Sequence, residues 1–290
     1  MEAISGKTYY SAIAQDTVAT IINDLITVGA KPEVINAYFA VGDSAWFLNK
    51  KRIDALITGW KKACDTARTA WGGGETPALS GIINPQTIEL GGAATGVIKP
   101  KENLIIGDKL RAEDLIILIE SSGVHANGLT LIRKIAKKLK NGFATKMPSG
   151  KIFGEAILNP TIIYAKLINS LQKEKVNIHY AVNITGHGWR KLMRHSNKFT
   201  YLIENIPSPQ EEFLFIQKYG KISDTDMYGN FNMGAGFAIF ISKKDLVLVE
   251  KVSKALNLKI YNAGVVKTGP KQVKILPKHI LYKEETLNIR

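Results

Sequence analysis

Residues 114–129 read DLIILIESSGVHANGL, and this stretch decides the fold. Its first seven residues form a nearly continuous apolar run, which predicts a β-strand. Small and polar residues follow from Ser121 to Gly128, and a helix is expected to begin near Leu129. This order suits anion binding, because backbone N–H groups and the positive end of a helix can meet at a phosphate. An ordinary tight turn between strand and helix has the same composition, so both interpretations stay open.

Upstream of this stretch, apolar periodicity alternates between helix and strand. Asp16 is placed to cap the first helix, and Gly29 to end it. The other elements predicted there are a buried strand at 34–41, a helix at 50–70 closed by a glycine-rich turn at 72–74, and a strand at 87–98.

The same mixture continues downstream. An exposed connection at 99–103 puts a domain boundary near residues 99–112. We therefore predict mixed α/β layers in two domains, residues 1–105 and residues 106–290. The elements predicted in the second domain, besides those of the opening stretch, are helices at 160–173, 186–194, 209–219 and 243–256, and strands at 199–204, 234–242 and 260–266.

Composition limits the class of protein. The 290 residues, 45% of them hydrophobic, are enough to bury a core. No stretch approaches the roughly 20 apolar residues that span a bilayer, and the start lacks a signal-peptide pattern, so a cytoplasmic protein without a membrane partner is expected. Cys64 is the only cysteine, which excludes an internal disulfide and a cysteine-based zinc cluster.

The formal charge of +14 raises the question of nucleic-acid binding, since clustered Lys and Arg release counterions from phosphates. The densest basic tract, residues 133–140, alternates charged and apolar residues at helical spacing, as a solvated helix face does. Nucleic acid is therefore not an expected partner. Attraction of small anionic substrates is the consequence that we expect of this charge.

Two carboxylates stand in unusual positions. Glu75 directly follows three glycines, whose backbone can fold closely around a ligand, and a carboxylate there suits Mg²⁺. Asp24 lies in an otherwise apolar helix, where it needs solvent, a cationic partner or a metal. The alternative for Glu75 is a first-turn acid of another helix.

Two later loops combine glycine with polar residues. In residues 183–188, NITGHG, His187 could bind a ligand or simply cap a turn, and Arg190 follows where it could meet an anion. In residues 230–236, NFNMGAG, the glycines could admit close backbone packing rather than a ligand. Neither loop is diagnostic by itself.

The order of these motifs resembles that of aminoimidazole ribonucleotide synthetase and its related-protein branch. The resemblance covers roughly residues 8–270, and its motifs are more specific for the superfamily than for one reaction. The motifs are Asn23-Asp24 with Gly29-Ala30, GGET at 73–76, SSGVHANG at 121–128, ITG at 184–186 and FNMGAG at 231–236.

The resemblance implies a two-domain synthetase fold. Its N-terminal mixed α/β domain pairs with its copy in a homodimer, as a dimer sheet or barrel, and its C-terminal domain packs helices on a mainly antiparallel sheet. The implied function is an ATP-dependent cyclo-ligase of purine biosynthesis, or a close phosphoryl-transfer relative. In that reaction ATP phosphorylates the amide oxygen of formylglycinamidine ribonucleotide, and a nitrogen then closes the ring. Electrostatics and positioning, without a covalent nucleophile, would lower the barrier.

The resemblance also implies roles for single residues, with ATP and Mg²⁺ as cofactors. Asp24 and Glu75 would be metal ligands and catalytic residues, and His125 a third catalytic residue. The implied nucleotide-binding residues are Asn23, Gly73, Gly74 and Thr76. The implied substrate- and phosphate-binding residues are Ser121, Ser122, Gly123, Asn127, Gly128, Thr185, Gly186, His187 and Arg190.

The chain departs from the family pattern in three places. No strand with a Gly-Val-Gly-Thr-Lys segment precedes Met1, so we expect the N-terminal domain to be truncated at its start. Asn183 stands where the purine enzymes usually have histidine, and His187 stands in place of a glycine. These differences favour the related-protein branch, and they leave open a non-catalytic nucleotide-binding member with a regulatory or scaffold role.

Overall fold

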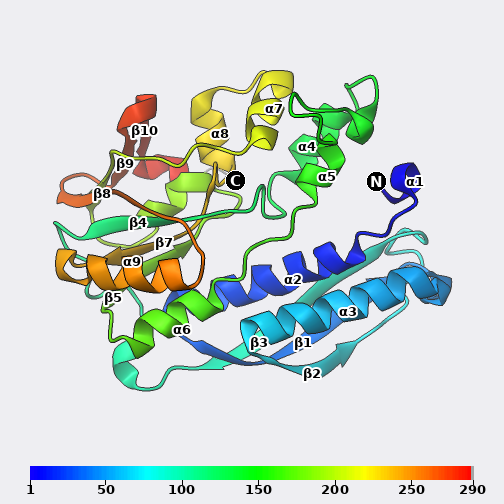
Figure 1. Ribbon diagram of the computed structural model, residues 1–290, viewed down its shortest axis with the longest axis horizontal. Helices are drawn as coiled ribbons and strands as arrows, with labels where there is room; N and C mark the ends of the chain where they lie inside the picture. Colours follow the sequence, from blue (N-terminus) through cyan, green and yellow to red (C-terminus); the bar gives the residue numbers. More distant parts are fainter. Residues whose placement is uncertain (289–290) are drawn as a thin grey trace.

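The computed structural model describes residues 1–288 and arranges them as two β-sheets with helices packed against both (Figure 1). A three-stranded sheet has the order β2-β1-β3, and a seven-stranded sheet the order β10-β9-β6-β8-β4-β7-β5. The strands are β1 (Lys31–Val41), β2 (Ala70–Glu75), β3 (Ile88–Val97), β4 (Leu115–Glu120), β5 (Ile178–Asn183), β6 (Phe199–Ile203), β7 (Ala235–Ile241), β8 (Ile260–Thr268), β9 (Gln272–Ile275) and β10 (Ile280–Lys283).

The helices include one pair that runs along the three-stranded sheet and others that cover the larger sheet (Figure 1). None of the described helices is long and apolar enough to cross a bilayer. The α-helices are α1 (Glu2–Ser5), α2 (Tyr10–Leu25), α3 (Lys50–Ala67), α4 (Leu129–Ala136), α5 (Phe153–Ile157), α6 (Ala165–Lys173), α7 (Glu211–Gly220), α8 (Asp224–Asn230) and α9 (Leu246–Ala255).

The three-stranded sheet is mixed, because β1 pairs in parallel with β2 and antiparallel with β3. Helices α2 and α3 pack against each other along it (Figure 1). The apolar stripe of α3 buries Leu56 and Trp60, as helical spacing predicts. Gly29 ends the α2 segment in a left-handed conformation with φ 80°, and a Cβ there would collide with the Asn103 carbonyl.

The seven-stranded sheet is antiparallel except for the β6–β9 pair. Its interior strand β4, which lies between β8 and β7, buries apolar side chains on both faces. Ile116 and Leu118 join one hydrophobic cluster, and Ile117 and Ile119 join another. The predicted α/β fold class, with helices on a mainly antiparallel second sheet, is confirmed.

The second hydrophobic cluster connects the two sheets. It contains residues of α2 and α3 together with Ile117, Phe237 and Ile239 of the larger sheet. Helix α6 lies in this connection and contacts α3, β1 and α9. The division into residues 1–105 and 106–290 stays a prediction, since the core itself is continuous across it.

Two local predictions were wrong, and one predicted helix is present but of another type. Asp16 lies inside α2 rather than at its N-terminal cap. Its carboxylate accepts hydrogen bonds from Thr161, not from backbone N–H groups at the start of the helix. The glycines at 72–74 form β2 rather than a turn. Gly74 has φ 155°, and a Cβ there would lie 2.0 Å from the Ala37 carbonyl oxygen of the neighbouring strand. The helix expected at 186–194 is a 3-10 helix, η5 (Gly188–Met193).

Candidate active site

Residues 121–128 form a loop between β4 and α4 that is held from within by Asn232. The Asn232 side chain is fully buried. Its Oδ1 accepts a hydrogen bond from Ser121 Oγ at 2.9 Å, and its Nδ2 donates to the Gly123 carbonyl at 2.8 Å. Ser121 N–H also donates to the Gly234 carbonyl. The motif at 230–236 therefore fixes the loop through an asparagine side chain, a role that glycine packing alone did not suggest.

His125 shapes the same loop as a buried, neutral side chain. Its Nε2 lies 3.0 Å from the Ser122 backbone nitrogen and accepts that N–H. Burial lowers the pKa of His125 to about 3, so the imidazole is uncharged near neutral pH. His125 and Ala126 both have positive φ, 52° and 55°, in a region that non-glycine residues rarely adopt.

Several backbone amide groups of this loop have no hydrogen-bond acceptor within the described residues. The N–H groups of residues 123–126 donate no hydrogen bond to any residue between 1 and 288. Gly128 caps α4 in a left-handed conformation with φ 69°, and a Cβ there would strike the Phe231 ring. Asn127 donates from Nδ2 to the His125 carbonyl at 2.6 Å. Consecutive unpaired amides beside a helix start can bind an anion.

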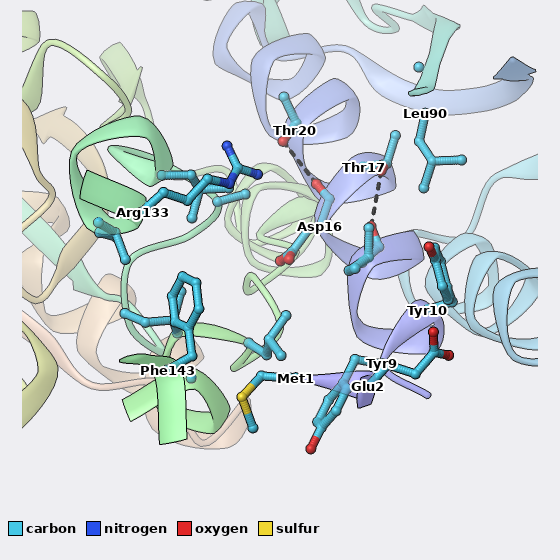
Figure 2. A pocket seen from close by; sticks show the side chains of 18 of the residues that line it. Met1, Glu2, Tyr9, Tyr10, Asp16, Thr17, Thr20, Leu90, Arg133 and Phe143 are labelled. Carbon is cyan, nitrogen blue, oxygen red and sulfur yellow. Dashed lines mark hydrogen bonds between the residues drawn. The ribbon is translucent and has the colours of Figure 1, made fainter. Parts of the chain in front are cut away.

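The loop adjoins a cavity of about 600 Å³, which Figure 2 shows from close by. Such a volume is typical of small-molecule sites. Helix α2 and strand β3 form one side, and α4 and α5 the other. Ala126 connects the cavity to the loop. Its remaining wall is largely apolar, with Ile13, Leu90, Leu129, Ile132, Phe143, Ile157 and Leu158 among the lining residues.

Asp16 is the carboxylate that α2 brings to this cavity. Its Oδ1 accepts two hydrogen bonds from Thr161, from the backbone N–H at 2.8 Å and from Oγ1 at 2.6 Å. Burial raises the pKa of Asp16 to about 6, against the opposing effect of these hydrogen bonds. The sequence offered one usable signal for this residue, because Asp16 and Asn23 are seven residues apart and share a helix face.

The next two turns of α2 carry Asn23 and Asp24. Asn23 is buried, and its amide bonds the Ile162 carbonyl and the Tyr164 N–H. Both polar atoms of this predicted nucleotide-binding residue thus connect α2 to the segment before α6. Asp24 is exposed, and its Oδ1 accepts a hydrogen bond from Asn183 Nδ2 at 2.8 Å. Asn183, one of the positions where the sequence departs from the pattern that it resembles, therefore orients the predicted metal ligand.

The other predicted metal ligand, Glu75, lies at the end of the edge strand β2. It is exposed, as are Gly73, Gly74 and Thr76. No hydrogen bond or ion pair within residues 1–288 joins Glu75 to Asp24 or to any other side chain. The described residues also contain no group of three or more His, Cys, Asp or Glu side chains arranged to hold a metal. No contact brings Asp24 and Glu75 together, so their roles as metal ligands stay predictions.

The loop at 185–188 is more enclosed than the sequence suggests. Thr185 Oγ1 accepts a hydrogen bond from the buried Lys191 at 2.8 Å, while Gly186 is exposed and His187 buried. The buried Arg190 guanidinium donates to the carbonyls of Gly229 and Thr286. Arg190 therefore connects η5 to α8 and to the turn at Glu284–Asn288, rather than facing an open anion site.

Comparison with known proteins gives this arrangement a family. Residues 4–98 match the model described as AIR synthase related protein, N-terminal domain, and residues 111–276 match the corresponding C-terminal domain. The chain belongs to the AIR synthase related protein family. This agrees with the order of motifs in the sequence.

Relatives of this family member include two proteins named phosphoribosylformylglycinamidine cyclo-ligase. The one from Methanocaldococcus jannaschii is 33% identical over 251 residues, covering 86% of this chain and 70% of that protein. The one from Carboxydothermus hydrogenoformans is 32% identical over 281 residues, covering 91% and 76%. A solved structure of the hydrogenase maturation protein HypE in complex with ATP is similar in fold, with a TM-score of 0.63, 16% identity and coverage of 93% of this chain and 78% of HypE.

Proposed function

We propose that this chain is an ATP-dependent cyclo-ligase that converts formylglycinamidine ribonucleotide to aminoimidazole ribonucleotide, or a close phosphoryl-transfer relative that acts in the cytoplasm. The observation that carries the proposal is the loop at 121–128, which has unpaired amides at residues 123–126 and meets the 600 Å³ cavity at Ala126. The relatives named as cyclo-ligases support this reaction class. The ATP complex of HypE supports ATP as the phosphoryl donor.

The residues present fit a magnesium–nucleotide complex. Asp24 and Glu75 are exposed carboxylates, and within residues 1–288 neither has a cationic partner. Oxygen ligands of this kind suit Mg²⁺, which usually takes one or two protein carboxylates besides phosphates and water. When bound, Mg²⁺ would neutralise charge on the nucleotide phosphates. We propose that Asn183 keeps the Asp24 carboxylate aimed at that complex through their hydrogen bond.

The chain itself would contribute positioning and hydrogen-bond donors. We propose that the amides of residues 123–126 bind a phosphate oxygen, and that neutral His125 fixes the loop by accepting the Ser122 N–H. A thiol nucleophile is not part of this chemistry. The one cysteine, Cys64, is buried in α3, and burial raises the pKa of its thiol to about 11.

We further propose that the protein works as a homodimer through the three-stranded sheet. Strand β2 is exposed at every position and forms an edge. Trp71 and Val97 expose 37% and 48% of their surface on this sheet. Unpaired edges and exposed apolar side chains favour association with a second copy. Sedimentation equilibrium should give twice the chain mass of 31.9 kDa, and a monomer at all concentrations would exclude this arrangement.

Turnover tests the proposed reaction. Phosphate release from ATP should require Mg²⁺ and formylglycinamidine ribonucleotide. Glu75→Ala and Asp24→Asn should each lower kcat/KM at least about 100-fold, since each removes charge needed near the transferred phosphoryl group. Both positions are exposed, so the melting temperature should not change. Asp54→Asn on α3 is a control, because Asp54 is exposed and pairs only with Lys50 within the described chain.

The outcomes separate the two candidate roles. Unchanged turnover in both Asp24 and Glu75 variants would exclude the assigned metal ligands. Magnesium-dependent ATP binding without phosphate release, with the ribonucleotide present, would instead indicate a nucleotide-binding member that regulates or scaffolds.

A further inference from the structure

The cavity beside the 121–128 loop carries opposite charges within a mainly apolar wall. Three charged side chains line it: Glu2, Asp16 and Arg133. Glu2 is neutralised, because Arg52 Nε donates to its Oε2 at 2.8 Å. Asp16 and Arg133 are therefore the charged side chains left to meet a ligand (Figure 2).

Asp16 presents a fixed and unpaired oxygen. Thr161 donates two hydrogen bonds to Oδ1, which holds the carboxylate in one orientation on α2. No described residue donates to Oδ2. Because burial disfavours the ionised form and raises the pKa of Asp16 to about 6, a cationic group at Oδ2 would remove an existing electrostatic cost.

Arg133 faces Asp16 from the other wall of the cavity. It projects from α4, the helix that begins directly after the loop. Arg133 is exposed, and within residues 1–288 its guanidinium makes no hydrogen bond or ion pair. A guanidinium with free donors can bind phosphate through two parallel hydrogen bonds. Figure 2 shows the Arg133 side chain extending from α4 towards the α2 side of the cavity.

We propose that this cavity selects the ribonucleotide substrate by its two charged ends, with Arg133 binding the 5′-phosphate and Asp16 Oδ2 binding the cationic amidine. This inference rests on the proposed function, since it assigns the substrate of that reaction to this cavity. The apolar wall between the two groups would cover the sugar. The magnesium complex of ATP fits less well, because its proposed metal ligands, Asp24 and Glu75, do not line this cavity.

Calorimetric titration with formylglycinamidine ribonucleotide, without ATP or Mg²⁺, tests the assignment. Arg133→Gln and Asp16→Asn should each weaken binding by roughly 10- to 100-fold, the range expected for one lost charge-assisted contact. Asparagine at 16 keeps an oxygen for the Thr161 donors, so the variant should stay folded. Lys134→Gln on α4 and Asp65→Asn on α3 are matched controls that remove exposed charges outside the cavity.

Titration with the nucleoside that lacks the 5′-phosphate shows which group of the ligand each residue contacts. Loss of the phosphate should abolish the effect of Arg133→Gln, while the effect of Asp16→Asn should persist. If the ribonucleotide binds both variants as tightly as the wild type, the inference is overturned but the proposed reaction is not. If Asp16→Asn and Arg133→Gln weaken ATP binding instead, the cavity is a nucleotide site and the inference is wrong. Failure of the wild type to bind the ribonucleotide would overturn both.

Discussion

Two glycine-containing segments that look alike in sequence are built in opposite ways. The loop at 121–128 lies against the interior, with Ser121 and Gly123 bonded to the buried Asn232. Strand β2 has a glycine-rich sequence of similar length, yet all of its residues are exposed. One segment is held by the chain's own side chains, whereas the other offers an open edge and a carboxylate, Glu75, to whatever binds there.

The difference separates two ways of preparing a site. Internal hydrogen bonds fix the backbone of the loop before any ligand arrives, so its amides need little reorganisation. The glycines of β2 instead permit close approach of β1, as the contact between Gly74 and Ala37 shows, without fixing the carboxylate that follows. Substitutions that act on one segment alone can test this distinction.

The largest effect is expected from Asn232→Ala. The change leaves the Ser121 hydroxyl, the Gly123 carbonyl and the Gly234 N–H without their partner in a buried site. We expect a loss of about 3 to 5 kcal/mol in the free energy of unfolding, measured by urea denaturation. Asn230→Ala is the matched control, since Asn230 is exposed and should cost less than about 1 kcal/mol. Equal effects would contradict a special role for Asn232.

The next effect concerns pH and tests the buried, neutral state of His125. Its pKa is about 3 in the folded protein and ordinarily 6.5, so the unfolded chain binds more protons between these values. Stability should fall as pH drops through that interval, by about 1.4 kcal/mol per pH unit from this group. His125→Asn should remove that component from stability measured at pH 6.5, 5.5 and 4.5.

Asp16→Asn gives a control of opposite sign. The pKa of Asp16 is about 6 in the folded protein, above its ordinary 3.8, so its contribution to stability is present below 3.8 and lost as pH rises through 6. Asp16→Asn should therefore make the free energy of unfolding rise more steeply with pH between 4 and 6. His125→Asn should make that rise shallower. The same change of slope in both variants would contradict these assignments.

The smallest effect separates two glycines of β2. Gly73 and Gly74 both have positive φ, but only Gly74 would bring a Cβ against the Ala37 backbone. Gly73→Ala should cost about 1 kcal/mol of conformational strain, and Gly74→Ala roughly 1 to 2 kcal/mol more. Thermal unfolding of the two variants, compared at one pH, measures the difference. Identical melting temperatures would show that β2 is not held against β1 in solution.

Local sequence predicted those parts of the fold that local sequence controls. Three elements could be predicted from the apolar pattern of their own sequences: β4, β7 and α3. Burial in a strand or on one helix face requires apolar residues in that order. Strand β5 escaped prediction because it carries His179, a polar residue that is buried beside two partners. One of them, Asp114, lies 2.7 Å from its Nδ1 and is far away in sequence. Strand β2 escaped because glycine is rare in strands and its partner β1 is remote.

The candidate site divides in the same way. The 121–128 loop could be predicted, since strand, small residues and helix are contiguous. The roles of Asp16 and Arg133 in the cavity could not be predicted from the sequence. The sequence explains Asp16 equally well as a helix cap and Arg133 as part of a solvated helix face. Only the approach of α2 to α4 gives these two residues a common cavity. Asn232 likewise needed the fold, since its partners lie 109 and 111 residues away.

The hydrophobic cluster that joins the two sheets also determines how the molecule can unfold. Side chains of α2 and α3 share one core with Ile117 and Phe237 of the larger sheet. Separation of the two halves would expose that core to water on both sides, and either half would lose packing that it cannot replace. The chain should therefore unfold in a single cooperative transition, in which the smaller sheet has no melting point of its own.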